Sequence, residues 1–273
     1  MRRAAHQMFD TPLVLDDPFA VRIVGRDAAE ALRSSPGGHQ DRFSKAARAF
    51  MVARSRIAED ALGDAIGRGA RQHVILGAGL DTFAYRNPFP ATALHVFEVD
   101  YAATQAWKRD SLAAAGILPP PSVTFAPVDF ERQTLAEGLG EAGFDRRAPT
   151  FFSWLGVTMY LSEEAIQSTL AFVGSTPAGG GLAFDYAVPR ASLPFMERFV
   201  FDALARRVAA AGEPFVTFFD PTTLCARLEA TGFHAVQDLD RDRINARYFT
   251  GRSDGLAIGG HLARVVTAEA GSS

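Results

Sequence analysis

His73-Val-Ile-Leu-Gly77-Ala78-Gly79-Leu-Asp81-Thr82 is the stretch that decides the fold. An apolar run of strand type ends here in a glycine-rich turn, and a second apolar run, residues 94–99, is followed by Asp100. Asp100 lies 21 positions after Gly79, close to the roughly 20-residue interval at which a nucleotide-binding βαβ unit places a carboxylate for ribose hydroxyls. The spacing predicts a nucleoside-type ligand; the alternative is an ordinary strand-to-helix turn in an α/β core.

The residue types in this stretch suit such a ligand. Glycine lets the backbone approach a ligand without a Cβ clash, and a carboxylate accepts hydrogen bonds from two hydroxyls. A dinucleotide fingerprint requires Gly or Ala three residues after the second glycine, where this chain has Thr82. An S-adenosylmethionine site holds no pyrophosphate and tolerates threonine there. Thr82 therefore favours S-adenosylmethionine over a dinucleotide.

The composition is that of a folded soluble protein. The 273 residues are 48% hydrophobic and 22% charged, which suits one large domain or a domain with a cap. The net charge of −3 and the lack of a Lys/Arg run argue against a nucleic-acid partner. The histidines and Cys225 show no metal-ligand spacing, so no metal is expected. Cys225, the only cysteine, excludes an internal disulfide, and its helical spacing from Leu228 predicts a small buried hydrophobe.

No export or membrane signal is recognised in the sequence. Residues 1–6 lack an apolar signal core. The longest apolar stretch, residues 148–161, is too short to span a bilayer and contains Ser153 and Thr158. A single cysteine also suits a reducing compartment. These features predict a cytoplasmic protein without a membrane partner.

Strand and helix patterns alternate along most of the chain. Apolar positions near a 3.6-residue period predict a long helix over residues 41–69. Strands are expected at residues 74–77, 94–99, 123–128, 150–155, 182–187, 234–239 and 261–267, most of them separated by helices. This alternation predicts an α/β fold, a doubly wound and mostly parallel seven-stranded sheet with helices on both faces.

Two regions depart from this alternation. Residues 1–40 mix short apolar pieces with turn sequences, and we expect a partly ordered arm that ends in a turn. Segment 188–219 contains a Phe-rich helical pattern that is longer than a crossover needs. Because long departures from a regular pattern are commonly functional, both regions are predicted to cap the active site of a single domain over residues 1–273.

Several strings together resemble a known family. They are Asp17-Pro18-Phe19-Ala20, Val-Ala-Arg54-Ser-Arg56, the run from Val74 to Arg86, Val-Phe-Glu98-Val-Asp100 and Met159-Tyr160-Leu161-Ser-Glu-Glu. Over residues 10–268 the chain resembles the leucine carboxyl methyltransferase family, and within it the bacterial branch of S-adenosyl-L-methionine-dependent methyltransferases. The resemblance implies a Rossmann-like methyltransferase with a helical cap and S-adenosyl-L-methionine as cofactor.

The resemblance also implies roles for particular residues. Arg54 would bind the methionine carboxylate of the cofactor, a task that suits the bidentate fork of a guanidinium. The turn under the cofactor would be Gly77, Ala78 and Gly79; Asp100 would bind the ribose, and Asp129 and Phe130 the adenine. From the residues alone, Arg54 would be a solvated charge on a helix, and Asp100 and Asp129 helix caps. Leu155 stands where many relatives have a glutamate, which questions a cofactor contact that some of them make.

The expected reaction is methyl transfer to an oxygen nucleophile of a small metabolite, with the chain aligning the reactants and excluding water. A carboxylate acceptor needs no general base, whereas a hydroxyl does, and no residue is assigned as catalytic. The Phe-rich segment favours an acceptor with an apolar body. Tyr186 and Arg190, just past the fifth strand, are the candidate acceptor contacts; the alternative for Arg190 is a surface charge.

Two other functions are compatible with a nucleoside signal. A nicotinamide-dependent oxidoreductase is disfavoured by Thr82 and by the lack of a Ser/Tyr/Lys-type or histidine catalytic constellation. A cofactor-binding protein without catalysis would account for Leu155 at the position of the family glutamate. The sequence leaves the oligomeric state open.

Overall fold

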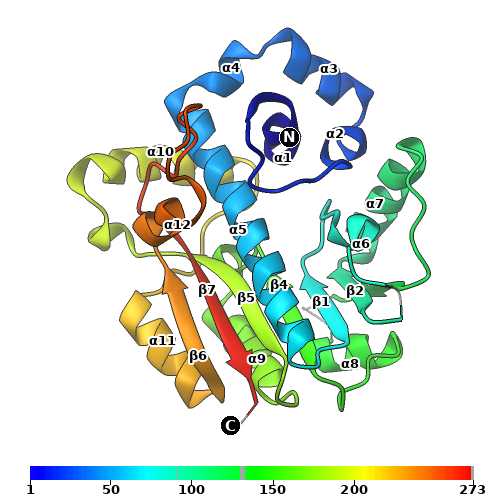
Figure 1. The fold of residues 1–273 in the computed structure, drawn as a ribbon. Helices are drawn as coiled ribbons and strands as arrows, with labels where there is room; N and C mark the ends of the chain where they lie inside the picture. Colours follow the sequence, from blue (N-terminus) through cyan, green and yellow to red (C-terminus); the bar gives the residue numbers. More distant parts are fainter. Residues whose placement is uncertain (91, 130–132, 272–273) are drawn as a thin grey trace.

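A seven-stranded sheet lies between two sets of helices in the computed structural model, which describes residues 1–90, 92–129 and 133–271 (Figure 1). The strands are β1 Gln72–Leu76, β2 His95–Asp100, β3 Val123–Pro127, β4 Thr150–Trp154, β5 Gly181–Ala187, β6 Phe233–Leu239 and β7 Ala263–Ala270. Their order is β3-β2-β1-β4-β5-β7-β6, and only the β7 pairings are antiparallel among the described strands. The predicted doubly wound, mostly parallel sheet is confirmed.

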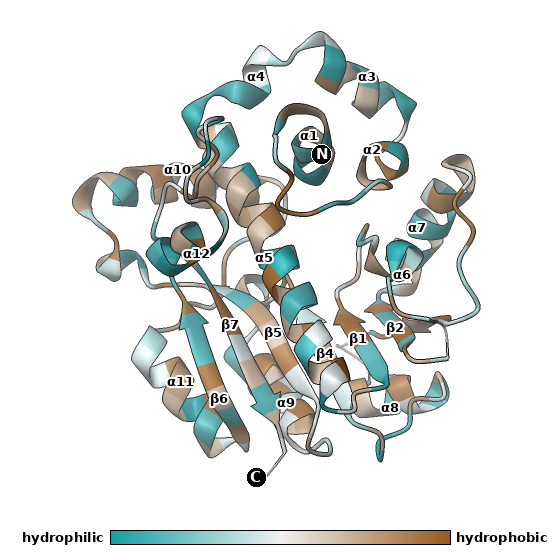
Figure 2. Ribbon diagram, viewed as in Figure 1, coloured by the Kyte–Doolittle hydropathy of each residue, from teal (hydrophilic) through white to brown (hydrophobic). Residues whose placement is uncertain are grey.

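Helices cover both faces of the sheet. One face packs against α5 Arg42–Gly67, α6 Phe83–Arg86, α7 Ala102–Ala114 and α12 Arg241–Tyr248. The other packs against α8 Leu135–Glu141, α9 Glu163–Gly174 and α11 Pro221–Ala230. Burial follows from this arrangement: β1 and β4 are buried along their whole length, whereas the edge strand β6 alternates between hydrophobic and hydrophilic residues (Figure 2).

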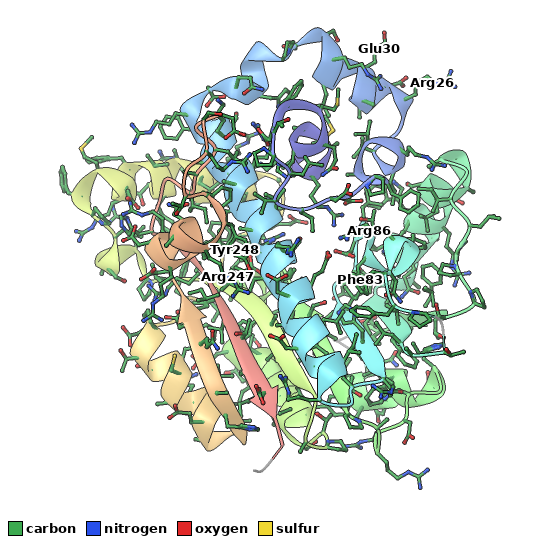
Figure 3. The ribbon with its side chains drawn as sticks, viewed as in Figure 1. Arg26, Glu30, Phe83, Arg86, Arg247 and Tyr248 are labelled. Atoms are coloured by element: carbon green, nitrogen blue, oxygen red, sulfur yellow. The ribbon has the colours of Figure 1, made fainter. Side chains whose placement is uncertain are left out.

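The long helix predicted over residues 41–69 is present as α5. Asp41 caps it by accepting hydrogen bonds from the backbone of Phe43 and Ser44 at 2.9 and 3.0 Å. At its middle, Asp60 accepts from Tyr248 Oη at 2.8 Å and Arg247 Nη2 at 3.1 Å, which ties α12 to α5 (Figure 3). The helix therefore forms the axis of one layer and carries Arg54 to the end of the sheet.

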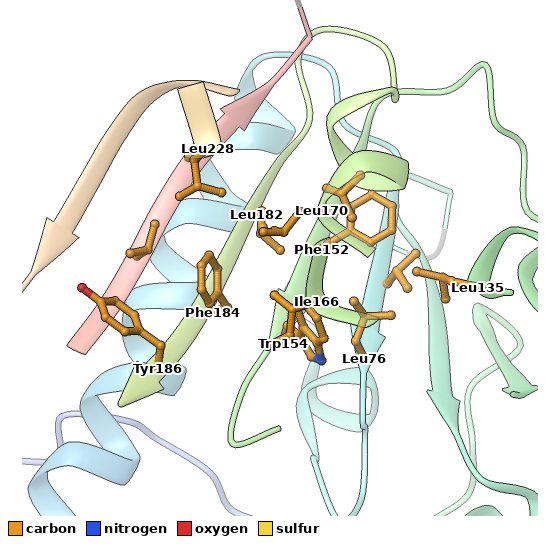
Figure 4. Packing of buried hydrophobic residues seen from close by; sticks show 14 of the residues in the cluster. Leu76, Leu135, Phe152, Trp154, Ile166, Leu170, Leu182, Phe184, Tyr186 and Leu228 are labelled. Carbon is orange, nitrogen blue, oxygen red and sulfur yellow. The ribbon is translucent and has the colours of Figure 1, made fainter. Parts of the chain in front are cut away.

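The larger part of the core lies on the opposite face. Phe152 and Trp154 of β4 and Phe184 of β5 pack against Ile166 and Leu170 of α9 (Figure 4). Each such side chain stabilises the fold by about 1.5–3 kcal/mol on burial. The core thereby fixes the ends of β4 and β5, from which the residues after the strands extend.

The N-terminal arm is more regular than the partly ordered segment expected from the sequence. Residues 1–40 contain α1 Arg2–Phe9, α2 Ala20–Ile23, α3 Arg26–Ser34 and α4 Gly37–Gln40. A small core of Ala4, Ala5, Ala20 and Leu32 holds these helices together, and α1 packs on α5. Such short helices depend on tertiary packing rather than on their own propensity, so periodicity alone does not reveal them.

The Phe-rich segment forms α10 Phe195–Ala210, preceded by a 3-10 turn, η2 Arg190–Ser192. Its inner side chain, Phe201, packs against Phe215 and Phe218, whereas Phe195 and Phe199 are exposed. Over the described ranges of the chain, no helix combines the length and hydropathy needed to cross a lipid bilayer.

Candidate functional site

The carboxyl ends of β1 and β4 form the natural site of this sheet. The chain leaves β1 toward β2 on one side and returns through β4 on the other, and such switch points open a crevice for ligands. Gly77 and Gly79 follow β1 with φ angles of +64° and +43°. A Cβ at Gly77 would lie 2.5 Å from Val157 Cγ2. Both the backbone conformation and this close approach explain glycine at the turn.

A cavity of about 200 Å³ opens at this point. The turn residues 77–81 form one wall, α5 contributes Arg54 and Ser55, and the end of β4 contributes Ser153 and Leu155. Arg3 of the N-terminal arm closes another side. The cavity therefore joins a glycine turn to charged groups of both signs.

Arg54 is held by a carboxylate from a distant strand. Its Nη1 donates to Asp185 Oδ2 at 2.6 Å, and the Gly156 backbone N–H donates to Asp185 Oδ1 at 2.5 Å. A Cβ on Gly156 would lie 2.8 Å from Arg54 Nη2, so glycine makes room for the guanidinium. Arg54 Nε is buried and has no hydrogen-bond partner among the described residues. An unpaired donor of this kind fits an anionic oxygen of a ligand.

Asp81 places a negative charge in the same cavity. Burial alone would raise the pKa of its carboxyl, but the charges of Arg3, Lys108 and Arg86 together hold the pKa below its usual range. Arg3 Nη1 lies 3.2 Å from Asp81 Oδ2. Arg54 and Asp81 thus give the cavity the two charges that complement a zwitterionic amino-acid group, such as the methionine end of S-adenosyl-L-methionine.

Asp100 connects the glycine turn to the end of β2. Its Oδ2 accepts from the Gly79 backbone at 2.7 Å and its Oδ1 from the Tyr101 backbone at 2.8 Å. Asp129 follows β3, whose pairing with β2 brings it to the same edge of the sheet as Asp100. Phe130 lies outside the described residues. The turn, Asp100 and Asp129 therefore lie at the same edge of the sheet, after β1, β2 and β3.

Thr82 has a structural role that the sequence did not reveal. Its hydroxyl donates to Asp17 Oδ2 at 2.7 Å, and both side chains are fully buried. Asp17 also lies 3.6 Å from Arg86 Nε, and Arg86 is paired with Glu59 of α5. We call these contacts the arm latch, because they fasten the N-terminal arm to the glycine turn. Arg3, which donates to the Leu80 carbonyl, strengthens the same junction.

A neutral histidine lies behind Ser153 of the cavity wall. His73 Nε2 lies 2.9 Å from Ser153 Oγ, and burial lowers the pKa of His73 to about 4. The imidazole is therefore uncharged at neutral pH, with Nδ1 unpaired among the described residues. No pattern in the sequence pointed to this pair, since His73 lies within an ordinary apolar strand. Through Ser153, it gives the cavity wall a fixed hydroxyl.

The two predicted acceptor contacts do not line this cavity. Tyr186 is buried in the core, and its hydroxyl donates to Asp238 Oδ1 at 3.0 Å (Figure 4). Arg190 is exposed on η2 and donates to both carboxylate oxygens of Asp202 at 2.6 and 2.7 Å. Their contact with an acceptor stays a prediction. Within the described ranges, no group of three or more potential metal-binding side chains is found.

Comparison with known proteins identifies the family. The model of the family described as leucine carboxyl methyltransferase matches residues 1–174. The chain belongs to this family. It is 31% identical over 280 aligned positions to YktD of Bacillus subtilis, provisionally named an S-adenosyl-L-methionine-dependent methyltransferase, covering 93% of this chain and 90% of YktD. A protein of Mycobacterium sp. (strain JLS) with the same provisional name is 36% identical. The match covers 64% of this chain and 60% of the Mycobacterium protein.

Solved structures agree on the fold. A DUF574-family protein of Streptomyces avermitilis superposes with a TM-score of 0.56 at 15% identity, over 92% of this chain and 95% of its own. An S-adenosylmethionine-dependent methyltransferase of Mesorhizobium loti superposes with a TM-score of 0.52 at 14% identity. The match covers 80% of this chain and 97% of that protein. Family membership makes the protein an S-adenosyl-L-methionine-dependent methyltransferase, with S-adenosyl-L-methionine as its cofactor.

Proposed function

We propose that this methyltransferase transfers its methyl group to an oxygen of a small metabolite, and that the cavity between β1 and β4 binds the amino-acid end of the cofactor. The arrangement of Arg54 carries the proposal. Asp185 occupies Nη1, and the buried Nε is left to donate to the cofactor carboxylate. Asp81 then receives the ammonium group, which compensates for the charge that Leu155 does not supply.

The remaining binding roles follow from position. Gly77, Ala78 and Gly79 give close backbone approach, and Asp100 accepts hydrogen bonds from the ribose hydroxyls. Asp129 contacts the adenine side, together with Phe130 as the family resemblance implies. The N-terminal arm and segment 188–219 cap the site and exclude water, with Arg3 already forming one wall of the cavity.

The chemistry of the described side chains favours an acceptor that is already anionic. When bound, S-adenosyl-L-methionine supplies an electrophilic methyl group. The chain has to align an acceptor oxygen with it, and a carboxylate needs no deprotonation. A hydroxyl acceptor needs a base, and the His73–Ser153 pair at the cavity is a poor one because burial holds the pKa of His73 near 4. We therefore place a small carboxylic acid first and a hydroxyl compound second.

The aromatic side chains of segment 188–219 suit the apolar body of such an acceptor. Phe215 lies between Phe201 of α10 and Tyr160, with ring centroids 6.2 and 5.7 Å away. Tyr160 follows β4 on η1 Thr158–Tyr160; burial and the charge of Glu213 raise the pKa of its hydroxyl, and the charge of Arg54 opposes this. In this arrangement Arg190 reaches an acceptor only by leaving Asp202.

The test incubates the protein with S-adenosyl-L-methionine and a panel of small carboxylic acids and hydroxyl compounds. Methyl transfer is measured by the release of S-adenosylhomocysteine. The expected product is a methyl ester, which mild base hydrolyses. A base-stable methyl ether would assign a hydroxyl acceptor instead. A product methylated on nitrogen or carbon would contradict transfer to oxygen altogether.

A further inference from the structure

A second, larger hollow lies outside the cofactor cavity. It is a groove of about 520 Å³ between the N-terminal arm, from α2 to α3, and helix α7. The only lining residue that it shares with the cofactor cavity, among the described residues, is Leu80. The groove is therefore a neighbour of the cofactor site and not part of it, and its volume falls in the range of small-molecule sites.

The hollow arises from small side chains on two helix faces. On α3, Arg26, Ala29 and Arg33 recur at helical spacing and face the groove; on α7, Trp107, Ser111 and Ala114 do the same. Ala29, Ser111 and Ala114 leave the middle of the groove open. The side chains of Trp107 and of three arginines also line it.

The charged residues that line the groove are all positive. Its lining contains Arg22, Arg26 and Arg33 but no carboxylate. Arg22 Nη2 is held by the carbonyls of Ala115 and Gly116 at 2.7 and 3.3 Å. Neither Arg26 nor Arg33 has an ion pair with a described acid, although Glu30 lies one turn from Arg26 (Figure 3). Unpaired guanidinium groups around a hollow attract an anionic ligand.

Trp107 supplies a second recognition element. Its side chain is 55% exposed, whereas the other tryptophan, Trp154, is 2% exposed. An indole face at the border of a groove stacks on planar rings, and such stacking tolerates any base. A ligand with both a planar ring and negative charge would contact Trp107 and the arginines at the same time.

We propose that this groove binds a nucleoside diphosphate, with its base on Trp107 and its phosphates on the arginines of α3. The seven-residue separation of Arg26 and Arg33 corresponds to about 10 Å along the helix axis, which suits an extended anion better than a single compact one. The guanidinium fork matches phosphate oxygens. The inference goes beyond the proposed function, because it concerns a separate site and needs no methyl acceptor.

The experiment measures binding of guanosine diphosphate to the full chain by calorimetry and by quenching of Trp107 fluorescence. Each titration is run with and without saturating S-adenosylhomocysteine, which blocks the cofactor site. We expect binding that weakens with added salt. Guanosine and pyrophosphate, each carrying half of the recognition elements, should bind at least about tenfold more weakly.

The variant Arg26→Ala/Arg33→Ala should lose about tenfold or more in affinity. A matched control, Arg146→Ala/Arg147→Ala, removes the same charge from exposed arginines outside the groove and should bind normally. Thermal melting checks that both variants fold. Three results would overturn the proposal: no binding at millimolar nucleotide, binding that S-adenosylhomocysteine abolishes, or equal losses in the two double variants.

Discussion

Arg54 and Asp185 lie 131 residues apart in the sequence and form a 2.6 Å ion pair at the crevice between β1 and β4. The pair is anchored by the Gly156 backbone on the Asp185 side, and on the other side the buried Arg54 Nε has no hydrogen-bond partner among the described residues. Asp185 is thus a positioning residue: it fixes the direction of Arg54 before any ligand arrives. This relationship leads to the first prediction.

Asp185→Asn should weaken binding of S-adenosylhomocysteine by about tenfold, because a neutral amide no longer forms an ion pair with the guanidinium and holds it less firmly. Calorimetric titration measures the change. The control is Asp202→Asn, which breaks the exposed pair with Arg190 and should leave affinity unaltered. Equal affinity of the Asp185 variant and the unmodified protein would show that Arg54 does not need this anchor.

Asp100→Ala should reduce cofactor affinity at least about tenfold, since hydrogen bonds to a charged group are worth about 1.5–3 kcal/mol each. The substitution removes both the proposed ribose acceptor and the bond that ties Gly79 to β2. Asp110→Ala, which removes an exposed acid from α7, is the matched control. An Asp100 variant that titrates like the control would place the ribose elsewhere.

His73 should make stability depend on pH. Burial lowers its pKa to about 4, from 6.5. Below pH 6.5 the unfolded chain binds a proton that the folded chain rejects, so stability is complete above pH 6.5 and is lost as the pH falls toward 4. The loss amounts to about 3 kcal/mol.

His73→Gln removes this titrating group and retains a hydrogen-bonding side chain beside Ser153. Denaturant unfolding from pH 7.5 to 4.5 should show the unmodified protein losing more stability than the variant as the pH falls. Because the carboxylates titrate in both proteins, their contribution cancels when the free energies of unfolding are subtracted. If the difference in free energy of unfolding between the two proteins stays constant from pH 7.5 to 4.5, His73 does not titrate in this way.

The arm latch should control how firmly residues 1–40 are held. Asp17→Ala leaves the buried Thr82 hydroxyl without its acceptor and removes the carboxylate that lies 3.6 Å from Arg86 Nε, at a cost of about 1–3 kcal/mol. Limited proteolysis should then cut within residues 1–40 faster. Asp16→Ala, which changes the exposed neighbouring acid, should be cleaved at the original rate. Identical cleavage of the two variants would assign the closure of the arm to other contacts.

Periodicity was sufficient for the regular part of the fold. The helix expected over residues 41–69 is observed at Arg42–Gly67, and each expected strand is present within a few residues of its predicted place. These elements have patterns that local sequence records, namely an apolar stripe or an apolar run with turn residues at its ends. The glycine turn and Asp100 came from spacing and are adjacent in the structure.

Long-range polar contacts could not be predicted. Nothing near Asp185 indicates that it holds Arg54, and nothing near Asp17 indicates that it accepts from Thr82. Thr82 was interpreted through the ligand, yet its hydroxyl faces the arm. Tyr186 looked accessible at the end of a strand, but the chain after β5 and the neighbouring Asp238 enclose it. Such contacts depend on tertiary packing, which a local pattern does not encode.

The pairing of β5 with β7 has a consequence for the order of assembly. Asp185 lies opposite Val265 in an antiparallel register, so the strand that carries it is completed by a segment that is synthesised after it. While a ribosome still holds residues 263–270, β5 is an unpaired edge and the anchor of Arg54 lacks its support. The candidate cofactor pocket is therefore expected to mature only after β7 has been synthesised and paired with β5, although its glycine turn emerges early.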